Sequence, residues 1–187
     1  MKFIIAPDSF KGSLTAQEAA KAIEQGIQRV FPNAVYELVP MADGGEGTVQ
    51  SLVDATAGEF CQDKVLNPFG QAVMATYGFL GDKKTAVIEM AAASGIQFIN
   101  DENTDPLSAT TYGTGQLMMD AIMNGAKKII IGIGGSATID GGQGMAEALG
   151  VRFLDKQGHQ IPRGGGGLSK LETIDVSHIS PLVRNVQ

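Results

Sequence analysis

The chain has 187 residues, 43% of them hydrophobic and 18% charged, a balance typical of a globular protein with one large core or two small ones. The formal net charge of -6 argues against a surface for nucleic acid or anionic membrane, but local donors would still bind an anionic substrate. The single cysteine excludes an internal disulfide, and no apolar run suits a signal peptide or membrane span, so we expect a soluble cytoplasmic protein.

The N-terminal region reads as a strand, a helix and a second strand. Buried strands are predicted over residues 3–6 and 34–39, with apolar residues at helical spacing between them. Thr15 and Glu18 form the pattern of a capping box, in which each side chain satisfies a free amide at the helix start. A βαβ unit predicts parallel strands, and ligands of open α/β sheets bind beyond the carboxyl ends of such strands. We therefore expect the loops after the two strands to lie together at a binding edge.

The first of these loops, residues 7–13, carries Asp8, Ser9 and Lys11 just before the helix. In a functional interpretation, Lys11 neutralises the charge of a phosphate or carboxylate, and Ser9 donates a hydrogen bond to it. The same residues also fit an ordinary solvated turn. Their spacing alone does not decide between these interpretations.

The second loop, residues 42–48, places Asp43 and Glu46 among three glycines. Asp43 would accept hydrogen bonds from a polyol or coordinate Mg²⁺. The alternative is an Asx turn, with Glu46 near the dipole of the helix that follows. Three glycines so close together exceed what one turn needs, which favours a binding loop.

Beyond that helix the chain changes to strand-like runs over residues 60–66, 72–79 and 86–90, which short connections separate. Connections of this length suit an antiparallel meander rather than crossover helices. The change indicates a domain boundary, which divides the chain into residues 1–62 and 63–187.

Several polar or glycine-rich features follow in the second part. Glu89 lies in an apolar run, so its carboxylate is predicted to have a cationic partner or to belong to a site, and we favour the site. Thr111, Thr114 and Gly115 resemble an anion-binding helix start, although plain helix capping explains them as well. Consecutive glycines over residues 164–167 predict a flexible loop that would serve as a mobile lid.

The stretch over residues 127–150 combines a short apolar strand, a glycine-rich turn and a helix start. This layout presents backbone amides to an anion, and glycine lets a phosphate approach the backbone closely. The hydroxyls of Ser136 and Thr138 would add donors, and Asp140 would hold Mg²⁺ or accept a proton. The stretch therefore predicts a phosphate-binding or substrate-binding loop.

Two other interpretations of the same stretch stay open. Tight packing of a strand against a helix would by itself require glycines. Residues Gly132 to Ala137 also fit the dinucleotide fingerprint GxGxxA, with Asp155 at a suitable distance for a ribose contact. That pattern would indicate an NAD-type oxidoreductase, but the later glycines make a wide loop rather than the tight turn that such folds use.

Five segments, taken together, resemble the bacterial glycerate kinase family. They are APDSFKGSLTA at 6–16, MADGGEGT at 41–48, IEMAAASG at 88–95, TYGTGQL at 111–117 and GIGGSATIDGG at 132–142. The resemblance implies phosphorylation of D-glycerate by ATP with Mg²⁺, usually to 2-phosphoglycerate. It also implies two α/β domains around a cleft: a discontinuous Rossmann-like domain, incomplete in this chain, and an inserted mixed α/β domain.

The resemblance also assigns roles to single residues. By position, it places Ser9 and Lys11, Asp43 and Gly44, and the loop 134–138 at the cleft. The chemistry of phosphoryl transfer agrees with catalytic roles for Lys11, Asp43 and Asp140, with Lys11 neutralising phosphoryl charge and either aspartate accepting the proton of the substrate hydroxyl. Substrate or phosphate binding falls to Ser9, Gly44, Gly45, Gly134, Gly135, Ser136 and Thr138. No metal ligand is assigned.

Two departures from the family pattern matter. Members of the family are much longer than this chain, so the resemblance covers their N-terminal half, and we expect the isolated chain to have little or no activity. Ile139 stands where the family usually has asparagine, which argues against ligand binding at that position. A non-catalytic fragment that binds a small acid remains an alternative, and a homo-oligomer is left open.

Overall fold

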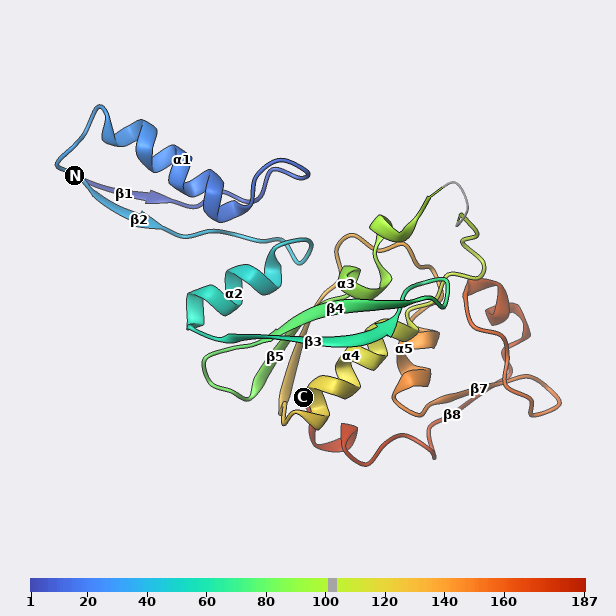
Figure 1. The fold of residues 1–187 in the computed structure, drawn as a ribbon. Coiled ribbons are helices and arrows are strands. Elements are labelled where there is room, and N and C mark those ends of the chain that lie inside the picture. The colour runs from blue at the N-terminus through green and yellow to red at the C-terminus, as the bar shows by residue number, and fades with distance from the viewer. Residues whose placement is uncertain (101–103) are drawn as a thin grey trace.

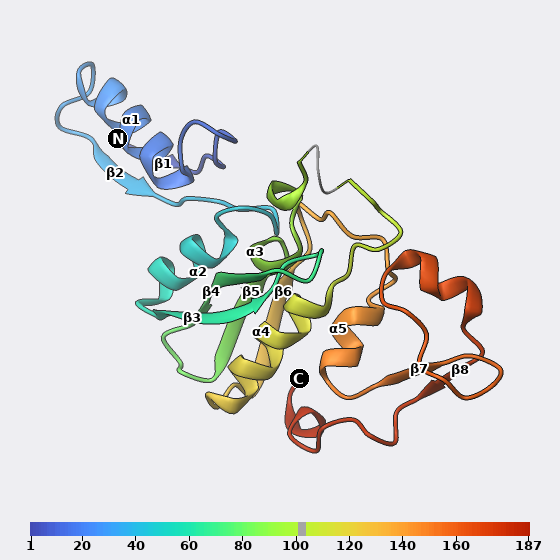
Figure 2. The same ribbon diagram turned by 45° about the vertical axis from the view of Figure 1, so that its right-hand side comes forward.

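The computed structural model describes residues 1–100 and 104–187, and three β-sheets organise this part of the chain (Figure 1). The first is a parallel pair, and a helix connects its two strands, so the predicted βαβ opening is confirmed. Figures 1 and 2 show this N-terminal unit standing out from the rest of the molecule. Its elements are β1 (Lys2–Ile5), α1 (Ala16–Gln28) and β2 (Val35–Leu38).

The capping box at the start of α1 is present as predicted. The amide of Thr15 donates to Glu18 Oε2 at 2.8 Å, and the amide of Glu18 donates to Thr15 Oγ1 at 3.2 Å. These reciprocal bonds satisfy amides that the helix leaves without intrahelical partners. The helix start is therefore determined by local sequence.

The second sheet has four strands in the order β3-β4-β5-β6. The first three strands form the predicted antiparallel meander, whereas β5 and β6 are parallel because a helical crossover joins them. The elements are α2 (Thr48–Thr56), β3 (Glu59–Leu66), β4 (Ala72–Phe79), β5 (Thr85–Glu89), α3 (Ala91–Ser94), a 3-10 turn (Ile96–Phe98), α4 (Tyr112–Met123) and β6 (Lys128–Gly132).

Helices cover both faces of this sheet. Successive residues of a strand point to opposite faces, so Val87 and Ile88 of β5 belong to two different clusters of buried side chains. Ile88 packs in the larger cluster with Leu117 of α4, and Val87 packs with Val53 of α2. The buried side chains on both faces fix β5 as an inner strand of the sheet, and the segment that follows its carboxyl end is fixed with it.

A third region completes the chain around a small core of Val151, Phe153 and Ile161. The four-glycine segment, predicted as a flexible loop or lid, is instead largely a 3-10 helix with a buried Gly167, because its backbone packs closely against neighbouring segments. The carbonyl of Gln187 accepts a hydrogen bond from the amide of Ile129 in β6, and the amide of Gln187 donates to the carbonyl of Lys127 just before that strand. The elements are α5 (Gln143–Ala148), β7 (Arg152–Leu154), the 3-10 helix (Gly165–Lys170), β8 (Thr173–Asp175) and a 3-10 turn (Val183–Asn185).

The predicted boundary between residues 62 and 63 falls inside β3, which pairs with β4 along its whole length. In addition, α2 packs on the four-stranded sheet through Val49 and Val53 rather than on the N-terminal unit. We propose that the division between the two parts lies in the connecting segment 39–47 instead. A boundary there separates the βαβ unit from the sheet without cutting a strand.

Two further points concern the described part of the chain. None of its helices combines the length and the apolar character that crossing a membrane requires. The polar sequence over residues 100–106 is typical of a loop, but residues 101–103 lie outside the described residues.

Candidate active site

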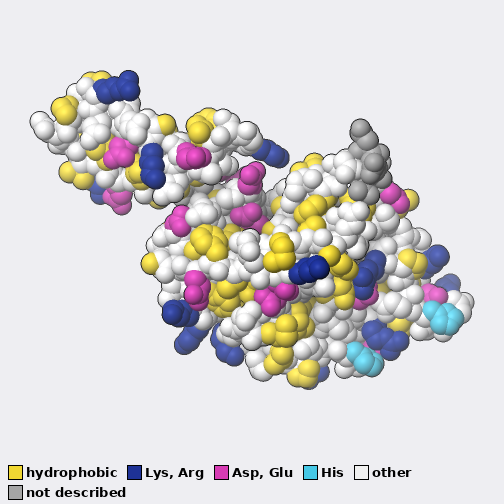
Figure 3. All heavy atoms as spheres, in the orientation of Figure 1, with side chains coloured by type: hydrophobic (Ala, Val, Ile, Leu, Met, Phe, Trp, Pro, Cys, Tyr) yellow, Lys and Arg dark blue, Asp and Glu magenta, His cyan; other side chains and the backbone are white. Residues whose placement is uncertain are grey.

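A cleft of about 1000 Å³ lies between the N-terminal unit and α2. Figure 3 shows the molecule hollowed between these two parts, with acidic and basic side chains around the hollow. One wall includes Ser9 and Lys11 from the loop after β1. The opposite wall includes Glu46 and Gly47 from the segment after β2, and Gln50 of α2. The loops that follow the two parallel strands therefore face one another, as expected from their topology.

Lys11 lies on a short turn that two backbone hydrogen bonds close. The amide of Phe10 donates to the carbonyl of Leu14 at 2.8 Å, and the amide of Leu14 donates back to Phe10 at 3.0 Å. The Lys11 side chain is exposed, and none of the ion pairs among the described residues involves it. Its positive charge is therefore available to an anion in the cleft.

The segment 43–47 forms the Asx turn that the sequence left open. Oδ1 of Asp43 accepts a hydrogen bond from the amide of Gly45 at 3.0 Å, and the Asp43 side chain is exposed. Only one carboxylate oxygen is used in this bond. The turn thus orients Asp43 without consuming its capacity to accept further hydrogen bonds.

Glu89 has a role that the sequence analysis did not consider. Its Oε1 accepts a hydrogen bond from the amide of Val49 at 2.8 Å, so it caps the first turn of α2 from 40 positions away. The N-cap residue of α2 is Gly47, which has no side chain to do this. Burial raises the pKa of the Glu89 carboxyl above its ordinary value, and hydrogen bonds from backbone amides oppose the rise. Glu89 therefore supports the cleft wall through α2.

The two glycine-rich loops touch each other backbone to backbone. The amide of Gly134 donates to the carbonyl of Gly44 at 2.9 Å. A Cβ atom at Gly132 would lie 2.5 Å from the Gly44 oxygen, and one at Gly134 would lie 2.7 Å from the Cα of Gly45. Any larger residue would push the loops apart. At these positions glycine is required by close packing, which is one of the alternatives that the sequence left open.

Ser136 and Thr138 lie farther along the second loop. Their hydroxyl oxygens are 3.0 Å apart, and Ser136 Oγ also accepts from the Thr138 amide at 3.0 Å. The amide of Ala137 between them donates to the carbonyl of Ser94 at 3.0 Å. Ser136 is exposed and Thr138 is partly buried. The loop thus presents a small hydroxyl turn at the surface, and its backbone is anchored to α3.

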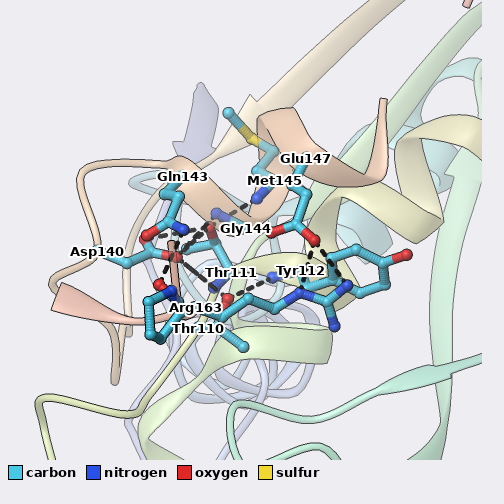
Figure 4. Close-up of polar contacts among 10 residues, drawn as sticks. Thr110, Thr111, Tyr112, Asp140, Gln143, Gly144, Met145, Glu147 and Arg163 are labelled. Carbon is cyan, nitrogen blue, oxygen red and sulfur yellow. Dashed lines mark hydrogen bonds and ion pairs between the residues drawn. The ribbon is translucent and has the colours of Figure 1, made fainter. Parts of the chain in front are cut away.

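Asp140, in contrast, is buried, with 1% of its surface exposed. Figure 4 shows its carboxylate pointing into the junction between α4 and α5. The carboxylate accepts from the amides of Thr111 at 2.8 Å, Gly142 at 3.0 Å and Gly144 at 3.1 Å. The hydroxyls of Thr110 and Thr111 also contact it. A carboxylate so enclosed cannot reach a substrate hydroxyl, so the geometry does not support the predicted role of Asp140 as a base.

The predicted anion-binding start of α4 is occupied by the same carboxylate. Thr111 donates its amide to Asp140, and the Thr114 hydroxyl lies 2.8 Å from that of Ser94. A Cβ atom at Gly115 would lie 2.3 Å from the carbonyl of Met145, so this glycine permits close approach of α5. All three residues serve contacts within the chain.

Arg163 is a feature that the sequence analysis missed. Its Nε and Nη2 donate to Glu147 Oε1 at 3.0 and 2.9 Å, and its guanidinium lies 3.5 Å from the centre of the Tyr112 ring (Figure 4). Burial disfavours the charged guanidinium, but Glu147 outweighs this effect and raises the pKa of Arg163. The pairing residue is 16 positions away in sequence, and no periodic pattern relates the two. The ion pair stabilises the same junction that holds Asp140.

The predicted site residues thus fall into separate groups. Ser9 and Lys11 line the cleft. Gly44, Gly45 and Gly134 form the loop contact, while Asp43, Gly135 and Ser136 are exposed beside it. Asp140 lies inside the junction, and Thr138 is partly buried at the loop. The segment 43–47 connects the first two groups, because Glu46 and Gly47 belong to the cleft and Gly44 and Gly45 to the loop contact.

The dinucleotide interpretation does not fit this geometry. Gly44 and Gly45 pack against the backbone of Gly132 and Gly134, which the fingerprint instead uses for close approach of the pyrophosphate. Asp155 follows β7, which pairs with β8 in a sheet separate from β6. Its carboxylate accepts from amides of its own turn. The glycine strand and the acidic residue are therefore not neighbours in one sheet, as the fingerprint requires.

The fold and these loops define an α/β protein. The turn that carries Lys11 and the glycine-rich loops lie at the carboxyl ends of parallel strands, next to a cleft. Comparison with known proteins gives a closer assignment. The model of the glycerate kinase family matches residues 3–187, and the chain belongs to that family.

Individual relatives agree with this assignment. The chain is 57% identical to the glycerate kinase of Bacillus subtilis (strain 168) over 187 residues, which is 100% of this chain and 49% of that protein. It is 51% identical to the glycerate 2-kinase of Escherichia coli (strain K12) over 185 residues, 99% of this chain and 49% of that protein. A crystal structure assigned to glycerate kinase 2 of Salmonella typhimurium LT2 matches with a TM-score of 0.88 and 50% identity, over 100% of this chain and 51% of that one. The chain therefore spans about half the length of these relatives.

Proposed function

We propose that this chain forms the N-terminal half of a kinase that transfers the terminal phosphoryl group of ATP to D-glycerate, with 2-phosphoglycerate as the product. The proposal is supported by family membership over residues 3–187. The structural observation that carries it is the cleft faced by Lys11 on one side and by Glu46 and Gly47 on the other. We expect the protein to act in the cytoplasm.

Phosphoryl transfer depends mainly on positioning the reactants and on neutralising negative charge in the transition state. Lys11 suits this role because its ammonium is exposed at the cleft and free of ion pairs with the described residues. Ser136 and the amides of its loop would orient the phosphates. We propose Asp43, and not Asp140, as the acceptor of the glycerate hydroxyl proton, because only Asp43 is exposed.

Mg²⁺ would enter with the nucleotide. Within the described residues, no group of three or more His, Cys, Asp or Glu side chains is arranged to hold a metal ion. Kinase sites bind Mg²⁺ through one or two carboxylates together with the substrate phosphates, which does not require such a group. Asp43 and Glu46 are exposed carboxylates in the segment beside the cleft, so they fit this limited role.

The test is a coupled assay for ADP release with D-glycerate and MgATP, and phosphorus NMR identifies which hydroxyl is phosphorylated. A protein of the relatives' full length that carries these 187 residues should turn over, and the 187-residue chain alone should have little or no activity. Absence of glycerate phosphorylation by the full-length protein would refute the proposal. Thermal shifts with ATP and with NADH provide a second comparison, since a ligand at a hundredfold its Kd stabilises by about 2.7 kcal/mol.

A further inference from the structure

The buried carboxylate of Asp140 connects segments that are far apart in sequence. Its Oδ2 accepts from the amide of Thr111, next to the start of α4, and from the amide of Gly144 in α5. Its Oδ1 accepts from the amide of Gly142, which precedes α5. The Thr111 hydroxyl donates to the carboxylate and accepts from the Met145 amide at 2.9 Å. Asp140 therefore joins the two helix starts through one side chain (Figure 4).

The same carboxylate ends the loop that carries Ser136 and Thr138. The loop begins at Gly134, whose amide is bonded to Gly44, and its middle is bonded to α3 through Ala137. Its other end is held by Asp140. Between these anchors the hydroxyls of Ser136 and Thr138 bond, among the described residues, only locally, to each other and to the backbone of Thr138. The conformation in which the loop presents them thus depends on how its ends are held.

We propose that Asp140 is a positioning residue for phosphoryl transfer: it holds the loop 134–140 in the shape that presents Ser136 and Thr138 to the nucleotide phosphates, and it contacts no substrate itself. This inference rests on the proposed function. It replaces the role of base or metal ligand that the sequence suggested for the same residue. The structural reason is that every contact of the carboxylate is already made within the chain.

Asparagine cannot take the place of Asp140 without moving the loop. Both carboxylate oxygens accept from backbone amides: Oδ1 from Gly142, and Oδ2 from Thr111 and Gly144. An asparagine NH₂ group on either side would face an N–H donor. An unsatisfied buried donor is costly, so the loop and the helix starts should shift apart.

The experiment measures steady-state kinetics of Asp140→Asn in the full-length protein, varying MgATP and D-glycerate separately. We expect the KM for ATP to rise roughly tenfold or more, because small displacements of positioning groups have effects of this size. The KM for glycerate should change little. Loss of folded protein alone would lower the apparent kcat and leave both KM values unchanged, and that result would overturn the inference.

Asp120→Asn is the matched control. Asp120 is a partly buried carboxylate that accepts from Tyr77 Oη at 2.8 Å and from Asn124 at 3.1 Å, within α4 and away from the loop. Its loss should destabilise the protein without raising the KM for ATP. Equal effects of the two substitutions on that KM would show that general destabilisation is responsible, and would overturn the inference.

A second pair of variants covers the case in which Asp140→Asn does not fold. Thr111→Val removes the hydroxyl that donates to Asp140 but keeps the side-chain shape and the backbone amide, whereas Thr111→Ser keeps the hydroxyl. The valine variant should raise the KM for ATP, and the serine variant should restore it. No difference between them in this KM contradicts the inference.

Amide hydrogen exchange separates this inference from the proposed function. Exchange over residues 134–138 should be faster in Asp140→Asn, or in Thr111→Val, than in Asp120→Asn, whether or not the protein phosphorylates glycerate. Unchanged exchange in this segment would show that Asp140 does not hold the loop. A wild-type protein without turnover would refute the proposed function on its own.

Discussion

The turn around Lys11 and the junction around Asp140 carry similar sequence patterns but have opposite structures. Both place charged and hydroxyl residues near a helix start, beside the single Gly12 at the turn and among several glycines at the junction. At the turn, Lys11 is exposed beside a cleft of about 1000 Å³. At the junction, Asp140 is enclosed by three backbone amides and two hydroxyls. A polar side chain is available to a ligand only where the protein has left its hydrogen-bonding or charge capacity unused.

The turn around Lys11 and the junction around Asp140 also require glycine for different reasons. Gly12 in the turn has a φ of +74° and open space around it, so its conformation is the reason for glycine. Gly144 in the junction has ordinary backbone angles, but a Cβ atom there would lie 2.1 Å from Thr110 Oγ1 and 2.6 Å from the Tyr112 amide. The first glycine permits a turn and the second permits contact between two helices. The sequence alone does not distinguish these reasons.

The largest expected effect is at the open region. Lys11→Ala in the full-length protein should lower kcat/KM by about a hundredfold or more, because a charge that faces the transferred phosphoryl group is removed. Stability should change by less than about 0.5 kcal/mol, since Lys11 is an exposed side chain. Kinetics and thermal unfolding check both values. Lys156→Ala, at an exposed lysine in the turn after β7, is the control, and near-normal kinetics of Lys11→Ala would remove Lys11 from the site.

The next effect is at the closed region and concerns stability. Gly144→Ala should destabilise the protein by about 1–3 kcal/mol, because the added methyl group overlaps atoms of the α4 start. Gly26→Ala is the matched control: Gly26 lies in α1 with nothing within 4 Å of its Cβ position, so alanine there should stabilise by about 0.5–1 kcal/mol. Denaturant unfolding measures both. A neutral Gly144→Ala would mean that the junction is looser than its contacts indicate.

Glu89 is partly buried, so it is intermediate between the exposed Lys11 and the buried Asp140. Its substitution should have the smallest effect, which is a change in how the free energy of unfolding depends on pH. Burial raises the pKa of its carboxyl in the folded protein above the value of about 4.5 that the unfolded chain has. The folded state therefore binds this proton more tightly, so the stabilisation from protonation is complete below pH 4.5 and is lost as the pH rises through the folded pKa.

Glu89→Gln removes this titration and keeps an oxygen that accepts from the Val49 amide. Relative to the wild type, the variant should become more stable as the pH rises from 4.5 toward neutrality. The gain should be smaller than the effects of Lys11→Ala and Gly144→Ala, because the Glu89 carboxyl is only partly buried and amide hydrogen bonds oppose the shift of its pKa. Melting temperatures across this range test it, with Glu172→Gln as an exposed control. A wild type that gains stability over the variant with rising pH would contradict the sign.

Much of the local structure could be predicted because the signals are local. The capping box of Thr15 and Glu18, the βαβ opening and the antiparallel meander each depend on residues close in sequence, and the structure confirms them. The site was predicted less completely. Ser9 and Lys11 do lie at a cleft, but the contact of Gly44 with Gly134 joins residues whose spacing carries no sign of it. Arg163 and Glu147 gave no signal, because an ion pair across a folded junction has no sequence period.

The sequence alone determined the α/β class and most of the element order, and it contains the motifs that resemble the glycerate kinase family. These depend on hydrophobic periodicity, capping and turn chemistry, which act over a few residues. Only the tertiary structure decided which polar residues are exposed and which are enclosed. Asp43 and Asp140 are both aspartates beside glycines, but one faces solvent and the other lies between two helix starts. Burial and hydrogen-bond saturation arise from segments that meet only when the chain is folded.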